Sequence, residues 1–233
     1  MGNVSTEKAY YYIDFLKFIG CTNINITGGE PLLHPAWREI IKYCFQKKLY
    51  VALTTNGLAL DLDDDTLQFV HHVALPLDGG NAHTNSMTRS KKQFYKVLQL
   101  IDQYKKGCYK FHLKINTVIT KYNFSELEQI LNIVDDSRLE WKLFVLHKKG
   151  YFYHFPEENT IPDAVSLSPL EHILKNEHKC TINYNGNGHT INNYEYIYQD
   201  NPVVLNFDGN LYRTECNNDI FLYNLDNSNY YIK

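Results

Sequence analysis

Residues 23–35 read NINITGGEPLLHP, and this stretch sets the pattern that most of the chain repeats. The segment NINIT alternates polar and apolar residues, which predicts a short strand. Gly28 and Gly29 then allow a tight turn, and Pro35 stands where the first residue of the next helix is expected. A strand that leads through a turn into a helix is the repeating unit of a parallel α/β sheet.

The same alternation extends on both sides of this stretch. Strands are predicted at 23–27, 50–55, 72–77, 111–120 and 139–146, and helices at 5–19, 35–48, 62–70, 90–106 and 124–134. A helix precedes every strand, so the strands should run parallel and be covered by helices. Because a β/α unit begins with a strand and this chain begins with a helix, we expect one further strand and its loop upstream of Met1. Five strands predict an open, partial barrel instead of a closed one of eight.

The character of the chain changes near residue 150, and two parts are predicted on that basis. Residues 1–150 form the partial barrel, and residues 151–233 form an α+β extension packed on it. The extension is predicted to hold a helix at 168–177 and strands at 193–198, 202–207 and 211–214. The pair Asp208-Gly209 between the last two strands is typical of a hairpin turn.

The composition excludes several classes of protein. The 233 residues carry a formal net charge of -3, so no general basic field exists for nucleic acid. No stretch approaches the roughly 20 apolar residues of a membrane span, and the N-terminus lacks the features of a secretory signal. The five cysteines are an odd number, which indicates a reduced, cytoplasmic protein and no disulfide framework. We therefore expect neither nucleic acid nor membrane as a partner.

Polar residues follow each predicted strand, at the end of the sheet where parallel α/β folds bind ligands. They are Gly28, Gly29, Glu30 and Pro31 after the first strand, Thr55 and Asn56 after the second, Asp78 after the third, and Asn116 and Thr117 on the fourth. The fifth strand carries Lys142 and Phe144. The glycines let a backbone approach a ligand, and Glu30 can accept a hydrogen bond from an ammonium group. Each motif alone is typical of an ordinary turn, but their recurrence at one sheet end indicates a ligand site.

Five segments together resemble the radical S-adenosylmethionine (radical SAM) superfamily. They are NITGGEPLLHP at 25–35, LTTNG at 53–57, LPLDGG at 75–80, KINTVITKYN at 114–123 and EWKLFVL at 140–146. The order and spacing resemble those of the family's partial (β/α)6 barrel, which is similar to a TIM barrel that is not closed. Within the superfamily, the last two segments are similar to viperin-like enzymes, which act on nucleotides.

The resemblance implies roles for the residues at the strand ends. Gly28, Gly29 and Glu30, in the motif that Pro31 completes, would receive the amino group of SAM. Thr55, Asn56 and Asp78 would lie near its carboxylate and ribose, Asn116 and Thr117 near the ribose or adenine, and Phe144 and Val145 along the adenine. The family reduces SAM with a [4Fe-4S] cluster and so forms a 5′-deoxyadenosyl radical that abstracts a substrate hydrogen. A reductant such as flavodoxin or ferredoxin is implied, with a small-molecule, nucleotide or peptide substrate.

The chain departs from the family in its cysteines. The family binds its cluster through a C-x3-C-x2-C loop after the first strand, and thiolates are the usual ligands of such clusters. This spacing is absent among Cys21, Cys44, Cys108, Cys180 and Cys216. We therefore expect no metal in this chain, and we interpret the missing strand and the missing loop as one truncation. As written, the chain is not expected to cleave SAM reductively.

Two other functions fit the same residues. One is a cluster-free SAM- or nucleotide-binding regulatory module that keeps the fold. The other is an unrelated partial-barrel enzyme with Glu30 and Asp78 as acid and base. DNA upstream of Met1 separates the enzyme core from the regulatory module, because an in-frame C-x3-C-x2-C supports the former. Anaerobic reconstitution of an extended protein tests the unrelated enzyme, which would give neither absorbance near 400 nm nor 5′-deoxyadenosine.

Overall fold

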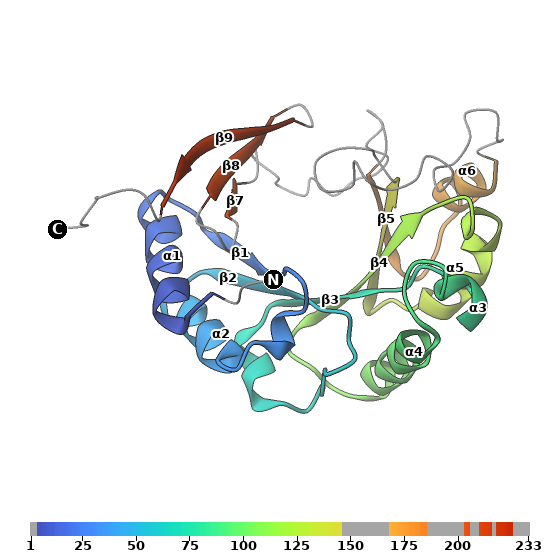
Figure 1. Cartoon of the computed structure of the whole chain (residues 1–233). Helices are drawn as coiled ribbons and strands as arrows, with labels where there is room; N and C mark the ends of the chain where they lie inside the picture. The colour runs from blue at the N-terminus through green and yellow to red at the C-terminus, as the bar shows by residue number, and fades with distance from the viewer. Residues whose placement is uncertain (1–3, 146–167, 186–202, 206–209, 216–217, 226–233) are drawn as a thin grey trace.

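The computed structural model describes residues 4–145, 168–185, 203–205, 210–215 and 218–225. Six parallel strands form one curved sheet in the order β1-β2-β3-β4-β5-β6 (Figure 1). The strands are β1 Asn23–Ile26, β2 Tyr50–Thr54, β3 His72–Pro76, β4 His112–Ile119, β5 Leu139–Val145 and β6 Thr181–Asn185. A partial α/β barrel is therefore confirmed, and the five predicted strands are all present.

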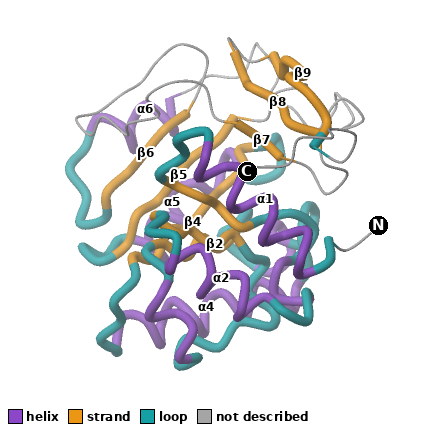
Figure 2. The backbone as a smooth tube through the Cα atoms, turned by 90° about the vertical axis from the view of Figure 1, so that its left-hand side faces the viewer, coloured by secondary structure: helices purple, strands orange, loops and turns teal. Residues whose placement is uncertain are grey.

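The helices lie on the convex side of the curved sheet, as Figure 1 shows. They are α1 Thr6–Phe18, α2 Trp37–Gln46, α3 Ala82–Asn85, α4 Lys91–Lys106, α5 Leu127–Val134 and α6 Ser168–Lys175, with short 3-10 helices η1 Pro31–Leu33, η2 Asp65–Phe69 and η3 Phe124–Glu126. In the view turned by 90°, α2 and α4 lie on one side of the strands and β8 and β9 on the other (Figure 2). None of the described helices has the length and apolar character that a bilayer span requires.

The extension contains a strand that the sequence did not predict. After α6, strand β6 runs parallel to β5, with Glu140 opposite Thr181, and so continues the main sheet. Its sequence TINYN is short and rich in asparagine, which has low strand propensity, so the alternation was not recognised. The strand predicted at 193–198 lies outside the described residues.

A second, antiparallel sheet holds β7 Val203–Leu205, β8 Asn210–Glu215 and β9 Asn218–Asn224. The predicted pairing of the first two strands is confirmed, with Leu205 opposite Leu211, although the Asp208-Gly209 turn itself lies outside the described residues. Figure 1 shows this sheet at the β1 end of the main sheet. Strand β1 is the edge strand there, and within the described part of the chain it pairs only with β2.

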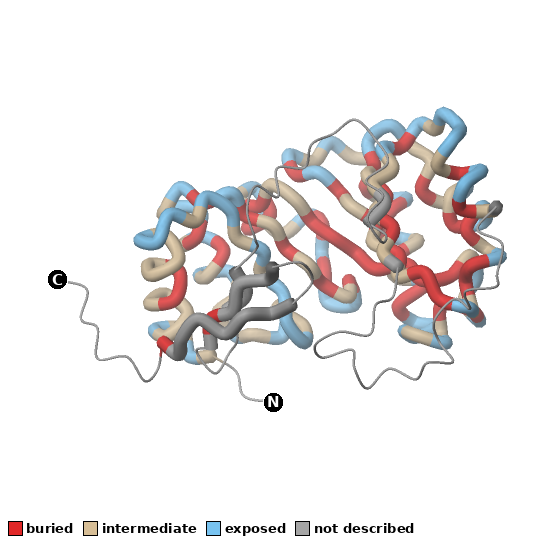
Figure 3. Tube along the Cα trace, turned by 90° about the horizontal axis from the view of Figure 1, so that it is seen from above, coloured by how far each residue is buried: buried red, intermediate tan, exposed pale blue. Residues whose placement is uncertain are grey.

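Strand residues alternate between two chemically different faces. The residues that face the helices are buried and apolar, and they include Val51, Leu53, Val73, Leu75, Leu113, Ile115, Trp141 and Leu143. They pack with helix residues that include Ile41, Val97, Leu100, Leu127 and Ile130. Figure 3 shows this burial concentrated along the central strands. The opposite, concave face is called the inner face below, and in register across it lie Ala74, Lys114 and Glu140, then Pro76, Asn116 and Lys142.

We expect Leu113 and Leu33 to differ strongly in how much each contributes to the free energy of unfolding. Leu113 is fully buried, whereas Leu33 is 73% exposed. Leu113→Ala should lower the free energy of unfolding by about 2–5 kcal/mol, because it removes buried methyl groups and leaves a cavity. Urea denaturation followed by far-UV circular dichroism measures this change. Leu33→Ala is the control and should change it by less than about 0.5 kcal/mol, and equal effects of the two substitutions would contradict the packing described.

Candidate functional site

The turn after β1 exposes its backbone at the carboxyl end of the sheet. Gly28 and Gly29 are both exposed, and Gly28 has a φ of 133°, a conformation that favours glycine. A Cβ built on either glycine meets no atom within 4 Å. The turn therefore presents bare peptide groups that no side chain of its own covers.

The Glu30 carboxylate joins the ends of β1 and β2. Its Oε1 accepts a hydrogen bond from the Thr55 hydroxyl at 2.5 Å, and its Oε2 accepts one from the backbone N–H of Asn56 at 2.7 Å. Oε1 also accepts from the Leu32 amide at 3.2 Å and so caps η1, which begins at Pro31. Three of the residues expected at the site are thus in direct contact. Because the protein's own donors satisfy the carboxylate, its negative charge would act on a ligand at the turn through space.

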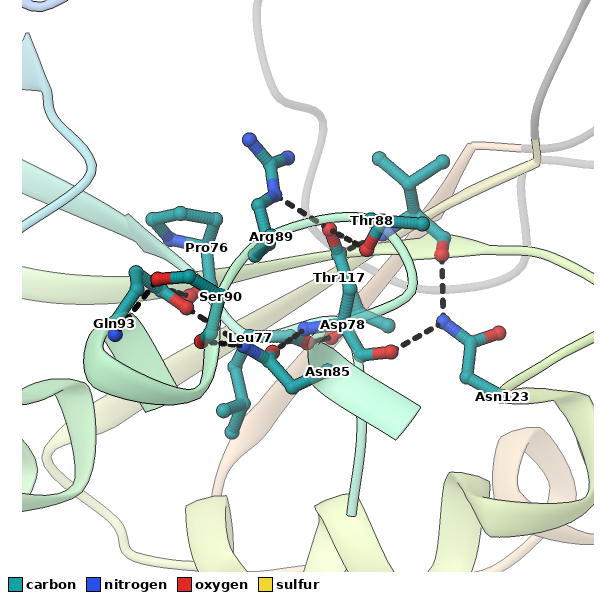
Figure 4. Close-up of polar contacts among 11 residues, drawn as sticks. Pro76, Leu77, Asp78, Asn85, Thr88, Arg89, Ser90, Gln93, Thr117 and Asn123 are labelled. Atoms are coloured by element: carbon teal, nitrogen blue, oxygen red, sulfur yellow. Dashed lines mark hydrogen bonds and ion pairs between the residues drawn. The ribbon is translucent and has the colours of Figure 1, made fainter. Parts of the chain in front are cut away.

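Asp78 follows β3, and only 1% of its side chain is exposed. Oδ1 accepts a hydrogen bond from the Val118 amide of β4 at 2.8 Å. Oδ2 accepts from Arg89 Nε at 2.7 Å and from the Thr88 hydroxyl at 3.2 Å (Figure 4). A buried carboxylate needs such partners. The carboxylate therefore ties residues 77–90, which contain α3 and are called the β3–α4 loop below, to β4.

Arg89 is a candidate that the sequence analysis missed. Its Nε binds Asp78, and Figure 4 shows the two terminal nitrogens projecting away from the network. Within the part of the chain that the structure describes, the hydrogen bonds of this side chain are made by Nε alone. A guanidinium fixed through Nε presents its other nitrogens as a pair of donors for an anion. The available sequence signal was a basic residue in the loop between a predicted strand end and the helix predicted at 90–106.

Buried amide side chains hold the β3–α4 loop in one conformation. Asn85 is fully buried, and its Oδ1 accepts from the Asp78 amide at 2.9 Å while its Nδ2 donates to Gln93 Oε1 at 2.8 Å. Gln93 in turn donates to the Pro76 carbonyl at 2.6 Å. A Cβ at Gly79 would lie 2.3 Å from the Asn85 nitrogen, so only glycine fits there. The loop that carries Arg89 is therefore packed against the end of β3.

Asn116 and Thr117 lie on opposite faces of β4. Thr117 is fully buried, and its hydroxyl donates to the Leu77 carbonyl at 2.6 Å and accepts from Trp141 Nε1 at 2.9 Å. Thr117 therefore supports the fold from the helix side. Asn116 faces the inner side, where its Oδ1 is buried and has no hydrogen-bond partner among the described residues. A buried acceptor without a partner is costly, and a ligand donor would satisfy it.

The inner face of β4 and β5 carries charged side chains. Lys114 Nζ lies 2.9 Å from Glu140 Oε1. Lys142 Nζ lies 4.9 Å from the centre of the Phe144 ring. Burial lowers the pKa of Lys142, and the charge of Lys114 lowers it further. Phe144, expected along an adenine, thus shares this face with Asn116, whereas the side chain of Val145 lies outside the described residues.

The cysteines that the structure describes do not form a cluster site. Cys44 and Cys180 are buried, and burial raises the pKa of each thiol to about 12. Cys21 and Cys108 precede β1 and β4, at the opposite end of the sheet, and Cys216 lies outside the described residues. Within the described ranges, no group of three His, Cys, Asp or Glu residues is placed to hold a metal ion. These residues do not fit a [4Fe-4S] cluster.

The buried Asp78–Arg89 pair gives a stability prediction. Asp78→Asn keeps the shape of the side chain but removes the charge and places an amide N–H or a weaker acceptor against Arg89. The free energy of unfolding should fall by about 1–3 kcal/mol. Chemical denaturation measures it, with Asp65→Asn as the control, because Asp65 is exposed. If the two variants are equally stable, the ion pair does not hold the loop.

His72 lies at the base of the inner face, with its Nδ1 2.7 Å from the Tyr50 hydroxyl. Burial lowers the pKa of His72 from 6.5 to about 4, and the charge of Lys114 contributes. The charge of Glu140 opposes this shift, while His112 and His71 add to it. The imidazole is therefore neutral in the folded protein at neutral pH.

This shift predicts a pH dependence of stability. Between pH 6.5 and about 4 the unfolded chain binds a proton at His72 that the folded chain does not, so stability falls as the pH is lowered through this window. The contribution to the slope is at most about 1.4 kcal/mol per pH unit, the limit for one proton. Urea denaturation at several pH values should show a shallower slope for His72→Gln than for the wild type. His83→Gln, at an exposed position, should keep the wild-type slope.

Comparisons with known proteins support the family and the fold. The radical SAM superfamily model matches residues 1–134. An AdoMet-dependent heme synthase from Methanosarcina barkeri is 30% identical over 74% of this chain and 48% of its own length. A SAM-dependent nucleotide dehydratase from Flammeovirga pacifica is 30% identical over 64% of this chain and 53% of its own. The chain thus spans about half the length of the curated relatives it matches.

A solved structure agrees with this fold. Streptococcus suis SuiB bound to S-adenosylmethionine matches with a TM-score of 0.63 and 14% identity, over 90% of this chain and 53% of SuiB. At that identity the match concerns the fold alone. The family model covers more than half of the 233 residues, and the chain belongs to the radical SAM superfamily.

Proposed function

We propose that this chain is the SAM-binding core of a radical SAM enzyme. The observation that carries the proposal is that an exposed Gly-Gly turn, the Glu30–Thr55–Asn56 contact and the Arg89 guanidinium all lie at the carboxyl ends of adjacent parallel strands. Ligands of parallel α/β folds bind at this end. The match of SuiB bound to SAM supports the same fold.

The methionine moiety of SAM carries an ammonium and a carboxylate, and the site offers a complement to each. The carbonyl groups of Gly28 and Gly29 would accept hydrogen bonds from the ammonium, with the Glu30 charge nearby. The terminal nitrogens of Arg89 would bind the carboxylate, because a guanidinium matches it in charge and shape. Asp78 contributes by fixing Arg89.

The adenosine moiety would lie along the inner face. The unpartnered Oδ1 of Asn116 would accept a hydrogen bond from a ribose hydroxyl or the adenine amino group. Phe144 would pack against the adenine ring. Thr55 and Asn56 would lie near the ribose and carboxylate, whereas Thr117 would act from the core by supporting β4.

A [4Fe-4S] cluster, which the described residues of this chain do not fit, would supply the one-electron reduction of SAM. The residues of this chain bind SAM, orient it and exclude water from the inner face. We propose that the three cluster thiolates belong to a segment outside these 233 residues, since the described cysteines do not fit. The electron donor is proposed to be a flavodoxin or ferredoxin and the substrate a nucleotide or peptide, in a cytoplasmic enzyme.

Arg89→Gln tests the proposal directly. The variant should weaken SAM binding about 10- to 100-fold, because it removes a charged donor pair from the carboxylate. Equilibrium dialysis with labelled SAM measures the dissociation constant on the full 233-residue chain. Arg138→Gln is the matched control, since Arg138 precedes β5 at the opposite end of the sheet and pairs with Asp136. Equal affinities of Arg89→Gln and wild type would contradict the assigned carboxylate site.

A cluster-free regulatory module is the second candidate, favoured by the lack of a fitting cysteine set in the described residues. Both candidates bind SAM, so binding alone does not separate them. A chain extended to include a C-x3-C-x2-C segment should yield 5′-deoxyadenosine under anaerobic reducing conditions if the enzyme proposal is right.

A further inference from the structure

Glu126 connects two loops that lie far apart in the sequence. It is the last residue of η3, in the connection between β4 and α5. Its Oε2 accepts a hydrogen bond from the Gly80 amide at 3.0 Å, and its Oε1 accepts from Asn81 Nδ2 at 2.9 Å and from the Thr84 hydroxyl at 2.6 Å. All three donors belong to the β3–α4 loop. One carboxylate therefore binds the first half of the loop that carries Arg89.

The same connection binds this loop at a second point. Asn123 Nδ2 donates to the Asp78 carbonyl at 2.9 Å and to the Val118 carbonyl at 2.8 Å. A Cβ at Gly80 would lie 2.5 Å from Gln129 Cβ, so the loop also packs closely on α5. The position of the β3–α4 loop is thus set from the β4–α5 connection.

A chain of contacts leads from Glu126 to Arg89. Asn81, held by Glu126, caps α3 by accepting from the His83 and Thr84 amides at 2.9 and 3.0 Å. Helix α3 ends at Asn85, whose carbonyl accepts from the Arg89 amide at 2.9 Å. Asn85 also binds the Asp78 amide. A displacement of α3 would therefore displace both the guanidinium and the carboxylate that aims it.

We propose that Glu126 is a positioning residue, which holds the β3–α4 loop so that the Arg89 guanidinium stands ready to bind the carboxylate of SAM. This inference rests on the proposed function. Glutamine at position 126 keeps the size of the side chain, but its amide nitrogen would face one of the three donors. A charged acceptor makes stronger hydrogen bonds than a neutral amide oxygen, so the loop should be held less firmly. Interactions that orient a binding residue commonly affect affinity without touching the ligand.

The test compares two ligands that differ only in the carboxylate. Dissociation constants of SAM and of decarboxylated SAM are measured by equilibrium dialysis on the full chain, for the wild type, Glu126→Gln and Arg89→Gln. Glu126→Gln should weaken binding of SAM about tenfold and leave binding of the decarboxylated analogue nearly unchanged. Glu128→Gln is the control, because Glu128 is exposed on the first turn of α5 and should change neither constant.

A purely structural role would give a different result. In that case Glu126→Gln would lower the unfolding midpoint but would keep the wild-type ratio of the two dissociation constants, and the inference would be overturned. Thr84→Val removes one of the three hydrogen bonds to Glu126. It should also weaken binding of SAM relative to decarboxylated SAM, and it replaces Glu126→Gln in the test if that variant fails to fold. Loss of carboxylate discrimination in Arg89→Gln but not in Glu126→Gln or Thr84→Val overturns only this inference. If Arg89→Gln keeps the discrimination, the carboxylate site of the proposed function fails as well.

Discussion

The negative charge of Asp78, almost completely removed from solvent, organises the carboxyl end of the sheet. It holds Arg89 at 2.7 Å and receives the backbone amide of Val118 from the neighbouring strand. An isolated buried carboxylate would be strongly unfavourable, so the surrounding donors are needed for the fold as much as for any ligand. Asn85 and Asn123 add amide contacts to the same short segment. The geometry of the strand ends thus depends on one buried anion and its donors.

The acidic residues at this end, Glu30 and Asp78, accept hydrogen bonds from donors of the protein itself. Glu30 accepts hydrogen bonds from Thr55 and Asn56, which follow β2, and Asp78 accepts from Arg89 and from Val118 of β4. What remains exposed is backbone at the glycine turn and the outer part of a guanidinium. A sulfonium amino acid, with its ammonium and carboxylate, matches these two features in charge. In the proposed function, recognition of SAM would depend on peptide groups of the glycine turn and on a guanidinium that Asp78 holds in place.

Local patterns predicted the strands and the strand ends, because periodicity and glycine turns are encoded within a few residues. They did not reveal Glu126, since its importance depends on contacts with residues more than 40 positions earlier in the chain. They did not reveal Arg89 either, because its role depends on the pair with Asp78, whose burial only the structure shows. The spacing of Asn123 and Glu126 is typical of a capping box, yet both side chains bind the β3–α4 loop instead. Strand β6 is not predicted from the sequence because it is short and two of its five residues are asparagine, which has low strand propensity. The sequence predicts Thr117 at the site but does not say which face of a strand a small hydroxyl occupies, and the structure buries it on the helix side.

The two faces of β4 differ in their surroundings, because one packs against the helices and the other lines the concave side of the sheet. Leu113, Ile115 and Ile119 are locked among the helices, whereas Lys114 and Asn116 alternate with them on the concave side. A substitution at every second position can thus alter what the barrel accepts while leaving the packed layer untouched. Divergent chemistries can arise on this scaffold by that route without a new core.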